Sequence, residues 1–569
     1  MESASLFDND NSQLKLAYDL ILSTNRNLFL TGKAGTGKTT FLRLLKASLP
    51  KRMIVVAPTG VAALNAGGVT IHSFFQLSFG PKIPGRYLSD HPDAEGFDPA
   101  QRRGFRFSRQ KMEIIRNLDL MIIDEISMVR ADLLDGVDDV LRRYRDPGRP
   151  FGGVQLLMIG DLLQLAPVVT DEDKQILEEY YDGPFFFNSR ALQATEYFCI
   201  DLQKVYRQKD PFFIDLLNRI RENRLDEIGT EMLLKRYKPG FSPPDKEGYI
   251  TLTTHNYQAV GINERKLSML PGNTKVFKAV VSGDFPEYIY PTEPLLQLKI
   301  GAQVMFCKND MGFEKKYYNG KIGIVVGLND DLVEVRCPGE EETITVGCEI
   351  WENIKYEMDE PSGVISEKVI GSFAQVPFKL AWAITIHKSQ GLTFEKAVVD
   401  AGSAFAFGQV YVALSRCKTL EGLVLRSVIT SRCLFRDPEL DRFVEESATR
   451  APDPFSIQTA SLLYQRNLVS ELFDFTAERS KLYFLAKIAG EHKDLLKHTS
   501  DGFLEEIVAG VNRDLFYPAL EEKQAIFAGI PDQCDIESDP SAQARIAQAC
   551  GQYRTVLEET LIEPIKPRA

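Results

Sequence analysis

A glycine-rich segment with the sequence GKAGTGKT follows an apolar run at residues 27–30 and precedes a helix-forming segment. This spacing, closed by Lys and Thr, is typical of a loop that wraps phosphates at the start of a helix. Its glycines let backbone N–H groups turn toward phosphate oxygens, the ammonium of Lys38 reaches the β and γ oxygens, and the hydroxyl of Thr39 holds magnesium. The segment therefore predicts a nucleotide triphosphate site. The residues expected to bind nucleotide are Gly32, Gly35, Thr36, Gly37, Lys38, Thr39 and Thr40.

Two adjacent carboxylates, Asp124 and Glu125, end a second apolar run, LMIIDE. Sheet proteins of this kind bind ligands at the carboxyl ends of their strands. We expect Asp124 to hold magnesium through water and Glu125 to accept a proton from the attacking water. The alternative is a solvated acidic pair at the end of a strand, which the preceding phosphate loop disfavours.

A glutamine and two arginines complete the predicted chemistry. Gln164 follows the run QLLMIGD, where a neutral amide can sense the γ-phosphate and orient water, although a plain strand-to-loop turn explains that pattern equally well. Arg207 in VYRQ and Arg416 in VALSRCK are expected outside the domain that carries the phosphate loop. A cation reaching the γ-phosphate from a second domain stabilises transition-state charge and couples domain closure to ATP. Taken alone, each arginine is more typical of a surface or an ion pair.

The elements that must position these residues form two series. Apolar strands alternate with helices from residue 27 to residue 169, which predicts an α/β fold with a parallel sheet covered on both faces. Short strands with an Asn319-Gly320 hairpin signal interrupt the second series and predict a small antiparallel barrel. The predicted limits are 1–195 for the first core with an insertion at about 79–109, 196–299 and 376–436 for the second core, 300–375 for the barrel, and 437–569 for a helical C-terminal region.

Composition sets further limits. The chain has 569 residues, 44% hydrophobic and 26% charged, which is typical of a multidomain globular protein. It lacks an apolar run of membrane-spanning length, and its start lacks the plan of a secretory signal, so we expect it in the cytosol or nucleoid. The eight cysteines show no zinc-ligand spacing and are expected to be reduced thiols. A net charge of −12 argues weakly against a nucleic-acid partner and, if DNA binds, predicts a narrow track that is sensitive to salt.

Seven motifs together resemble the helicases of superfamily one. In order they are GKAGTGKT, APTGVAALN with TIHSFF, IIDEIS, GDLLQLAPV, VYRQ, TIHKSQG and VYVALSRCK. The stretch DVLRRYRDPGRPFGGVQLLMIGD, with Phe151-Gly152-Gly153, resembles the marker of the Pif (petite integration frequency) family in particular. The resemblance implies a magnesium-dependent DNA helicase that hydrolyses ATP and moves 5′-to-3′. It also implies two RecA-like cores, a small insertion in the first and an SH3-like barrel in the second, and a nuclear or mitochondrial location if the source is eukaryotic.

Carried onto this sequence, the resemblance adds residues to both sites. Gly391 joins the ATP site, and Gln13 matches a glutamine that reads adenine edges, unless it is an exposed helix residue. Hydroxyls, imidazoles and backbone amides can contact phosphates without reading sequence, and Phe74 or Phe75 could offer a stacking surface. For a lone histidine, a satisfied core or surface position is the usual alternative. The expected DNA-binding residues are Pro58, Thr59, Gly60, His72, Ser73, Thr254, His255, Asn256, His387 and Lys388.

Two other functions stay open. A RecD-like motor subunit that works inside a nuclease complex has a similar core, and a DNA-stimulated clamp ATPase would close on DNA without moving along it. We expect single-stranded and forked DNA as partners, no membrane, a monomer, and any protein partner at the C-terminal helical region. Tyr317 and Tyr318 beside the Asn319-Gly320 turn either contact DNA or fill the core of the barrel.

Overall fold

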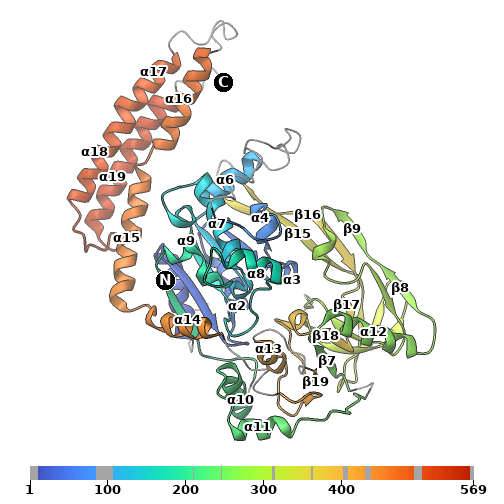
Figure 1. Ribbon diagram of the computed structural model, residues 1–569. Helices are drawn as coiled ribbons and strands as arrows, with labels where there is room; N and C mark the ends of the chain where they lie inside the picture. Colours follow the sequence, from blue (N-terminus) through green and yellow to red (C-terminus); the bar gives the residue numbers. More distant parts are fainter. Residues whose placement is uncertain are drawn as a thin grey trace. The chain divides into compact units, whose positions relative to one another are not determined.

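The computed structural model (Figure 1) describes most of the chain. It forms two compact units, one of Met1–Tyr18 with Asn27–Ala451 and one of Asp19–Arg26 with Pro452–Ala569. Most of the predicted insertion at 79–109 lies outside the described residues. The described ranges are 11–84, 107–208, 210–244, 247–310, 314–359, 363–400, 408–429, 437–491 and 503–563.

A six-stranded parallel sheet in the first unit has the order β3-β2-β4-β5-β1-β6. Its central strands are buried almost throughout because helices cover both faces. The strands are β1 (Asn27–Gly32), β2 (Met53–Ala57), β3 (Val69–Thr70), β4 (Leu120–Ile123), β5 (Gln155–Ile159) and β6 (Tyr197–Leu202). The accompanying helices are α1 (Ser12–Ser23), α2 (Lys38–Ser48), α3 (Gly60–Ala66), α4 (Ile71–Phe75), α6 (Arg109–Asn117), α7 (Ala131–Tyr144), α8 (Asp171–Leu177) and α9 (Arg190–Gln193).

Strand β6 corrects one prediction. The sequence assigned residues from 196 onward to the second core, but β6 pairs in parallel with β1 along its whole length, from Asn27 opposite Tyr197 to Gly32 opposite Leu202. An apolar run predicts a strand without naming its neighbour, and the edge of β1 that β5 leaves open accepts this one. The residues that follow β6 therefore start beside the phosphate loop.

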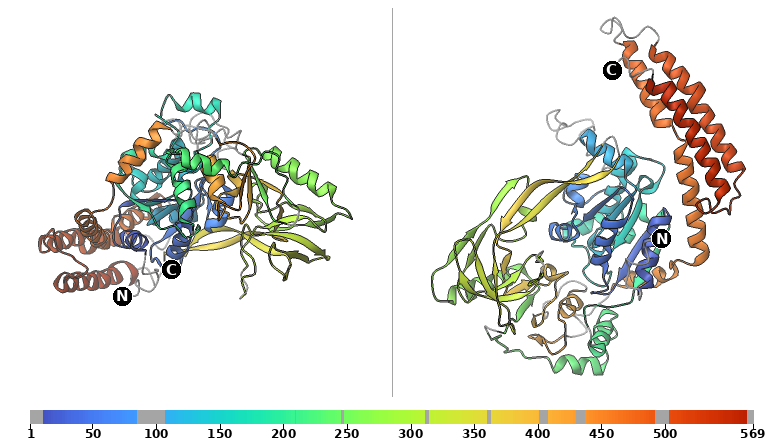
Figure 2. Two further views of the ribbon diagram at one scale, coloured as in Figure 1. Left: turned by 90° about the horizontal axis from the view of Figure 1, so that it is seen from below. Right: turned by 180° about the vertical axis from the view of Figure 1, so that it is seen from behind.

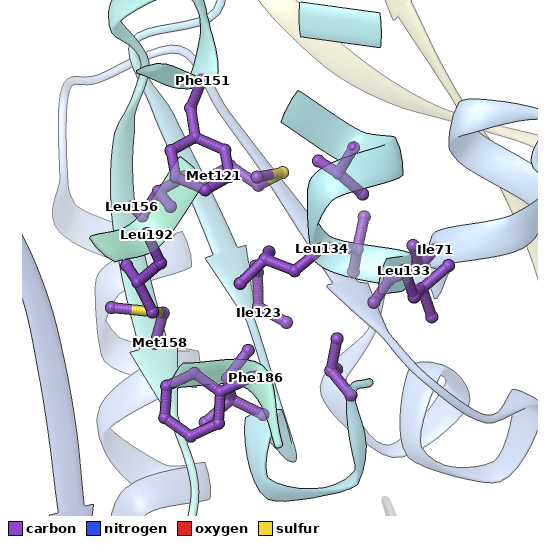
Figure 3. Close-up of a cluster of buried hydrophobic side chains, with 14 of the residues drawn as sticks. Ile71, Met121, Ile123, Leu133, Leu134, Phe151, Leu156, Met158, Phe186 and Leu192 are labelled. Carbon is purple, nitrogen blue, oxygen red and sulfur yellow. The ribbon is translucent and has the colours of Figure 1, made fainter. Parts of the chain in front are cut away.

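The Phe151-Gly152-Gly153 segment is a packing feature of the first core. Phe151 is fully buried against Met121 and Leu156 (Figure 3), and its backbone N–H donates to the carboxylate of Asp138. Phe151 and Gly152 adopt left-handed φ angles of 52° and 57°. A Cβ on Gly152 would lie 2.7 Å from the Leu141 carbonyl oxygen, so the turn requires glycine there.

A second parallel sheet has the order β18-β7-β19-β20. Helices α10 and α13 contribute to the hydrophobic cluster that covers it. Two parallel-sheet cores followed by C-terminal helices are therefore confirmed. The elements are β7 (Ile250–Thr253), β18 (Ala383–Thr385), β19 (Ala397–Asp400), β20 (Leu423–Leu425), α10 (Pro211–Arg221), α11 (Glu227–Leu234), α12 (Asn256–Met269) and α13 (Gln409–Ser415).

Antiparallel sheets interrupt the second core. One has the order β14-β13-β12-β11-β17, another β15-β16-β9, and β10 pairs with β8. Their strands begin before residue 300, where the sequence placed the start of this region. They are β8 (Lys275–Lys278), β9 (Val280–Gly283), β10 (Leu295–Leu298), β11 (Gln303–Phe306), β12 (Ile322–Leu328), β13 (Val333–Arg336), β14 (Thr343–Val346), β15 (Glu349–Met358), β16 (Ile365–Gln375) and β17 (Phe378–Leu380).

The turn at Asn319-Gly320 differs from the predicted hairpin. The Lys321 N–H donates to the Tyr318 carbonyl at 3.0 Å, and Gly320 has a φ of 98°, so a tight turn exists. However, strand β11 ends at Phe306 and β12 begins at Ile322, so this turn does not join two adjacent strand ends. A turn signal predicts the local bend and leaves the length of the connection undetermined.

Tyr317 and Tyr318 have different surroundings. Tyr317 is 8% exposed, its ring stacks on Phe306 at 4.4 Å, and its hydroxyl donates to the carboxylate of Glu349 at 3.1 Å. Tyr318 is 38% exposed, with the ammonium of Lys418 5.8 Å from its ring centre. Tyr317 therefore fills the core, whereas Tyr318 is accessible.

A long hairpin that the sequence did not predict returns to the first sheet. Figure 2 shows β15 and β16 reaching from the antiparallel sheets toward the first core. Tyr356 on β15 is buried, and its hydroxyl accepts a hydrogen bond from the Val55 N–H at 3.0 Å. Strand β3 is parallel to β2 and pairs only with Val56 and Ala57, so Tyr356 satisfies the backbone of Val55, one residue before the pairing with β3 begins.

Helix α14 (Pro438–Thr449) belongs to the first unit, where Phe443 stacks on Phe187 at 4.0 Å. The second unit contains α15 (Pro454–Leu472), α16 (Thr476–Glu491), α17 (Phe503–Gly510), α18 (Tyr517–Ala528) and α19 (Pro540–Leu557), with π-helical turns at Val511–Phe516 and Glu558–Ile562. Two apolar clusters hold these helices together. Within the described ranges, none of the helices has the length and apolarity needed to cross a bilayer.

Candidate functional site

Three neighbouring strands bring the predicted catalytic segments together. Strands β4, β5 and β1 are adjacent and parallel, so their carboxyl ends lie at one edge of the sheet. The phosphate loop follows β1, the Asp124-Glu125 pair follows β4, and the Asp161–Gln164 segment follows β5. Residues separated by more than 120 positions thus share one site.

The phosphate loop has the backbone that its glycines predict. Gly35 and Gly37 have φ angles of 83° and 93°, which a side chain would disfavour. The ammonium of Lys38 donates to the Gly32 carbonyl at 2.6 Å and to the Lys33 carbonyl at 3.0 Å. Burial lowers the pKa of Lys38, and the charge of Asp161 opposes that shift. Thr36 is buried, whereas Thr39 and Thr40 are exposed at the start of α2.

The two carboxylates after β4 have different hydrogen-bond partners and different pKa values. The Glu125 N–H donates to the Asp124 carboxylate at 3.0 Å, and Glu125 adopts a left-handed φ of 54°. Burial raises the pKa of Asp124 to about 6, and burial together with the charge of Asp124 raises that of Glu125 to about 7. The amide nitrogen of Gln390 donates to the Glu125 carboxylate at 2.8 Å. A carboxylate whose pKa lies near neutrality suits a general base.

Gln164 is held by its neighbour Asp161. Its amide nitrogen donates to the Asp161 carboxylate at 2.9 Å, and both side chains are buried. The other Asp161 oxygen accepts hydrogen bonds from Arg221 at 3.0 Å and from the Leu163 N–H at 3.2 Å. Burial raises the pKa of Asp161, but the charges of Arg221 and Lys38 outweigh burial and lower it overall.

Arg207 lies against the phosphate loop, which differs from the predicted position in a separate domain. The N–H of Tyr206 donates to the Gly35 carbonyl at 2.8 Å, and a Cβ on Gly35 would lie 2.4 Å from the Arg207 Cβ. The cause is β6, which carries this segment to the edge beside β1. Burial lowers the pKa of Arg207, while the charges of Tyr411 and Glu125 oppose that shift.

Arg416 approaches the site from the second core, as predicted. It is 1% exposed, and its guanidinium donates to the Val412 carbonyl at 2.9 Å and to the Ser415 hydroxyl at 3.0 Å. Burial and the nearby charge of Arg207 lower its pKa to about 9. The neighbouring Gly391 has a φ of 79° and open space where a Cβ would stand.

The site fits a nucleotide triphosphate. Arg207 Nη1 is buried without a hydrogen-bond partner among the described residues. Arg207 and Arg416 are both buried and their charges act on each other, so phosphate oxygens beside them would offset the cost of burying two cations. The Thr39 hydroxyl and the Asp124 carboxylate are the hard oxygen donors that magnesium prefers. Over the ranges that the structure describes, no group of three acidic, histidine or cysteine side chains forms a metal site of its own.

Gln13 lies at the end of β6. Its amide nitrogen donates to the Asp201 carbonyl at 2.6 Å, and its oxygen accepts from the Gln203 N–H at 3.0 Å. Both contacts are with backbone groups, and they hold the Gln13 side chain beside the carboxyl end of β6.

Candidate DNA contacts of the second core lie at the ends of two paired strands. Thr254, His255 and Asn256 follow β7, and His387 and Lys388 follow β18, which is parallel to β7. The ammonium of Lys388 donates to the Asn256 side-chain oxygen at 3.0 Å. Burial lowers the pKa of His387, and burial together with the charge of Lys379 lowers that of Lys388. The ends of the two strands are therefore joined by the hydrogen bond between Asn256 and Lys388.

Candidate DNA contacts of the first core follow β2 and β3. Thr59 caps α3 by accepting from the Ala62 N–H at 3.2 Å, between half-buried Pro58 and Gly60. His72 is half-buried and Ser73 is exposed on α4. Phe74 and Phe75 are 5% and 0% exposed, so the predicted stacking surface is wrong. Their helical spacing places them on the inner face of α4.

Several residues beside the candidate sites were missed from the sequence. Phe79 is 83% exposed, with its ring stacked on His72 at 4.9 Å, so it offers the aromatic face that Phe74 and Phe75 do not. The Tyr411 hydroxyl accepts from the Ala34 N–H of the phosphate loop at 3.4 Å, and burial raises its pKa to about 12. Tyr411 lies within the VYVALSRCK motif and could have been chosen there. No local pattern marks Arg221.

Comparisons with known proteins agree with this geometry. The sequence model of one family, PIF1-like helicase, matches residues 8–229. The ATP-dependent DNA helicases PIF1 of Danio rerio and Homo sapiens are 35% and 36% identical over 410 and 414 residues, which is 70% of this chain. The chain spans 58% of the length of each.

Solved structures match over a larger share of their length. Bacteroides sp Pif1 in complex with ADP-AlF4 is 40% identical, with a TM-score of 0.69, over 77% of this chain and 97% of that one. Bacteroides Pif1 bound to single-stranded DNA is also 40% identical, with a TM-score of 0.54 and 97% coverage of that chain. Pif1 helicase from Candida albicans is 31% identical, with a TM-score of 0.55, over 76% of this chain and 98% of that one.

Proposed function

Because the chain belongs to the PIF1-like helicase family, we propose that it is an ATP-driven DNA helicase that moves 5′-to-3′ on one strand and unwinds duplex DNA. The observation that carries the proposal is the pair Arg207 and Arg416. Both guanidinium groups are buried beside Glu125, and Arg207 Nη1 points at no protein acceptor among the described residues. Two buried cations, one beside the phosphate loop and one from the second core, suit hydrolysis coupled to closure.

The residues divide the chemistry as follows. Lys38, with Gly32, Gly35, Thr36, Gly37 and Thr40, binds the phosphates, and Gln13 and Gly391 border the nucleotide. Thr39 and Asp124 would hold a magnesium ion, which would supply neutralisation of the phosphate charge. Glu125 accepts the proton of the attacking water, and Gln164 orients that water through the amide oxygen, since its amide nitrogen is bound to Asp161. Arg207 and Arg416 stabilise the charge that develops on the transferred phosphoryl group.

DNA would bind along the strand ends of both cores. Asn256 and Lys388, already joined by a hydrogen bond, would contact phosphates together with Thr254, His255 and His387. Pro58, Thr59, Gly60, His72 and Ser73 would provide the matching contacts in the first core. These groups would bind the sugar-phosphate backbone of DNA and would not distinguish between bases, which suits a motor that must move along any sequence.

The finer architecture belongs to the same proposal. We assign the two parallel sheets to RecA-like cores and the antiparallel region to an SH3-like barrel, with the predicted domain limits changed so that β6 joins the first core and the antiparallel region begins before residue 300. Single-stranded and forked DNA are the proposed partners, and solved Pif1 complexes include both kinds of DNA. We further propose a monomer in the cytosol or nucleoid, or in the nucleus or mitochondrion of a eukaryote. A protein partner would bind the C-terminal helices.

A strand-displacement assay tests the proposal. The purified chain is given ATP, magnesium and duplexes with a 5′ tail, a 3′ tail or blunt ends, with Lys38→Ala as the inactive control. Displacement of the 5′-tailed duplex alone is the expected result. DNA-stimulated ATP hydrolysis without displacement would instead indicate a clamp, and activity that needs added nuclease subunits would indicate a RecD-like motor.

A further inference from the structure

Arg221 is a buried arginine that lies beside the nucleotide site without belonging to any of its motifs. It ends helix α10 and is 10% exposed, and its guanidinium donates to the Asp161 carboxylate at 3.0 Å. Asp161 itself is 1% exposed. Among the described residues, Arg221 Nε is buried without an acceptor. An ion pair this deeply buried is costly to break, because either partner alone leaves an unpaired charge.

The pair joins elements of different cores. Phe213, Leu216 and Ile220 place α10 in the hydrophobic cluster of the second sheet, together with strand β7 and helix α13. Asp161 follows β5 of the first sheet. Arg221 is therefore a cation from the second core that is bonded directly to the first.

Asp161 connects Arg221 to two residues of the nucleotide site, Gln164 and Lys38. Its second oxygen accepts the amide nitrogen of Gln164 at 2.9 Å, so the orientation of that amide depends on where Asp161 is held. Its charge is also the strongest one acting on Lys38. Neutralisation by Arg221 keeps a buried carboxylate from repelling the phosphates that Lys38 binds.

We propose that Arg221 is a positioning residue that fixes Asp161, and through Asp161 the amide of Gln164, and so links the phosphate end of the nucleotide to movement of the second core. This inference rests on the proposed function and adds a residue to it. A shift of α10 would move Asp161 and rotate the Gln164 amide. Conversely, a phosphate that changes the orientation of the Gln164 amide would shift Asp161, and with it Arg221 and helix α10.

Five variants test the link. Arg221→Gln keeps hydrogen-bond donors and removes the charge, Arg221→Lys keeps the charge, and Asp161→Asn is made alone and together with Arg221→Gln in a double variant. Arg219→Gln is the matched control, because Arg219 lies two residues away on α10 in exposed ion pairs with Asp215 and Asp226. DNA-stimulated kcat and KM for ATP, melting temperature, and single-strand affinity with ADP and with a non-hydrolysable ATP analogue are measured.

We expect Arg221→Gln to lower kcat by about 10- to 100-fold, as for a displaced positioning group, with KM changed less than about threefold. Arg221→Lys should recover part of kcat. The double variant should be no slower than Asp161→Asn alone, because both residues act through one bond. The difference in DNA affinity between ADP and the ATP analogue should shrink in Arg221→Gln and persist in Arg219→Gln.

Wild-type kcat and an unchanged nucleotide dependence in a folded Arg221→Gln protein would overturn the inference. If Arg221→Gln does not fold, the double variant, which lacks the unpaired carboxylate, decides the question: a kcat equal to that of the wild type would overturn the inference in the same way. A wild-type protein without DNA-stimulated hydrolysis would instead refute the proposed function.

Discussion

At the scale of single residues, burial and neighbouring charges give two carboxyl groups at one sheet edge different pKa values. Glu125 has a pKa of about 7, raised by burial and by the charge of Asp124, whereas the pKa of Asp161 is lowered because the charges of Arg221 and Lys38 outweigh its burial. Of these two carboxylates, Glu125 can therefore exchange a proton near neutral pH, and Asp161 stays ionised and holds Gln164. Pairs of groups with separated pKa values indicate such a division of roles.

Substitutions of Lys38 and of Glu125 should have different effects on ATP binding and on hydrolysis. Lys38→Ala is expected to weaken ATP binding and turnover together, because the ammonium contacts phosphates in both the ground state and the transition state. Glu125→Gln is expected to keep nucleotide bound and stop hydrolysis, because only the base is lost. Equilibrium binding of a fluorescent ATP analogue and steady-state hydrolysis separate the two. Normal turnover in Glu125→Gln would remove Glu125 from the mechanism.

Arg207 and Arg416 should be needed for hydrolysis more than for nucleotide binding. Ala at either position is expected to lower kcat by about 10³-fold, the lower range for an arginine that stabilises transition-state charge. Arg207→Ala keeps the Cβ atom that packs against Gly35, so the packing of this segment on the phosphate loop is retained. Arg116→Ala, at an exposed pair with Glu113, is the control.

Arg416 also bonds to the backbone, so its variant is checked by melting temperature, with Arg416→Lys as a second substitution. Near-normal hydrolysis in either alanine variant would assign that arginine a structural role only.

At the scale of elements, the antiparallel region depends on a few buried rings. Tyr317→Ala should lower the free energy of unfolding by about 3–5 kcal/mol, the usual cost of deleting a buried aromatic side chain. Tyr318→Ala, one residue away and 38% exposed, should change it by less than about 1 kcal/mol. Chemical denaturation followed by circular dichroism makes the comparison. Equal losses would mean that the two rings share one environment.

The β15–β16 hairpin should stabilise the first sheet through one hydroxyl. Tyr356→Phe leaves the Val55 N–H without its partner, which should cost about 1–3 kcal/mol of unfolding free energy. Tyr288→Phe, at a tyrosine that is 67% exposed, is the control and should have no effect. Hydrogen exchange at Val55 should rise in Tyr356→Phe alone. Unchanged protection at Val55 would show that the contact contributes nothing to the sheet.

At the scale of the whole molecule, an acidic chain that binds DNA must do so through a local track. With a net charge of −12, the protein gains little from long-range attraction, and its affinity should come from few phosphate contacts. We expect the logarithm of single-strand affinity to fall with the logarithm of salt at a slope of roughly −2 to −4, corresponding to about three to six phosphates. Lys388→Ala should make the slope shallower by about 0.7. An affinity independent of salt would exclude a track built on phosphate contacts.

The sequence alone determined where the candidate catalytic segments lie relative to their strands. The phosphate loop, the acid pair after β4 and the Gln164 segment after β5 were placed correctly, because strand, turn and first helical residue are adjacent in the chain and their spacing sets the geometry. The parallel cores and the C-terminal helices followed from the periodicity of apolar residues.

Only the tertiary structure decided the contacts between distant segments. Strand β6 joined the first sheet, Tyr356 reached Val55, the Tyr411 hydroxyl reached Ala34, and Arg221 reached Asp161. Each partner lies 60 or more residues away along the chain, and apolar runs and single arginines look alike wherever they occur. Which of them meet depends on the free edges and the buried charges of all the elements together, and these exist only once the sheets have formed.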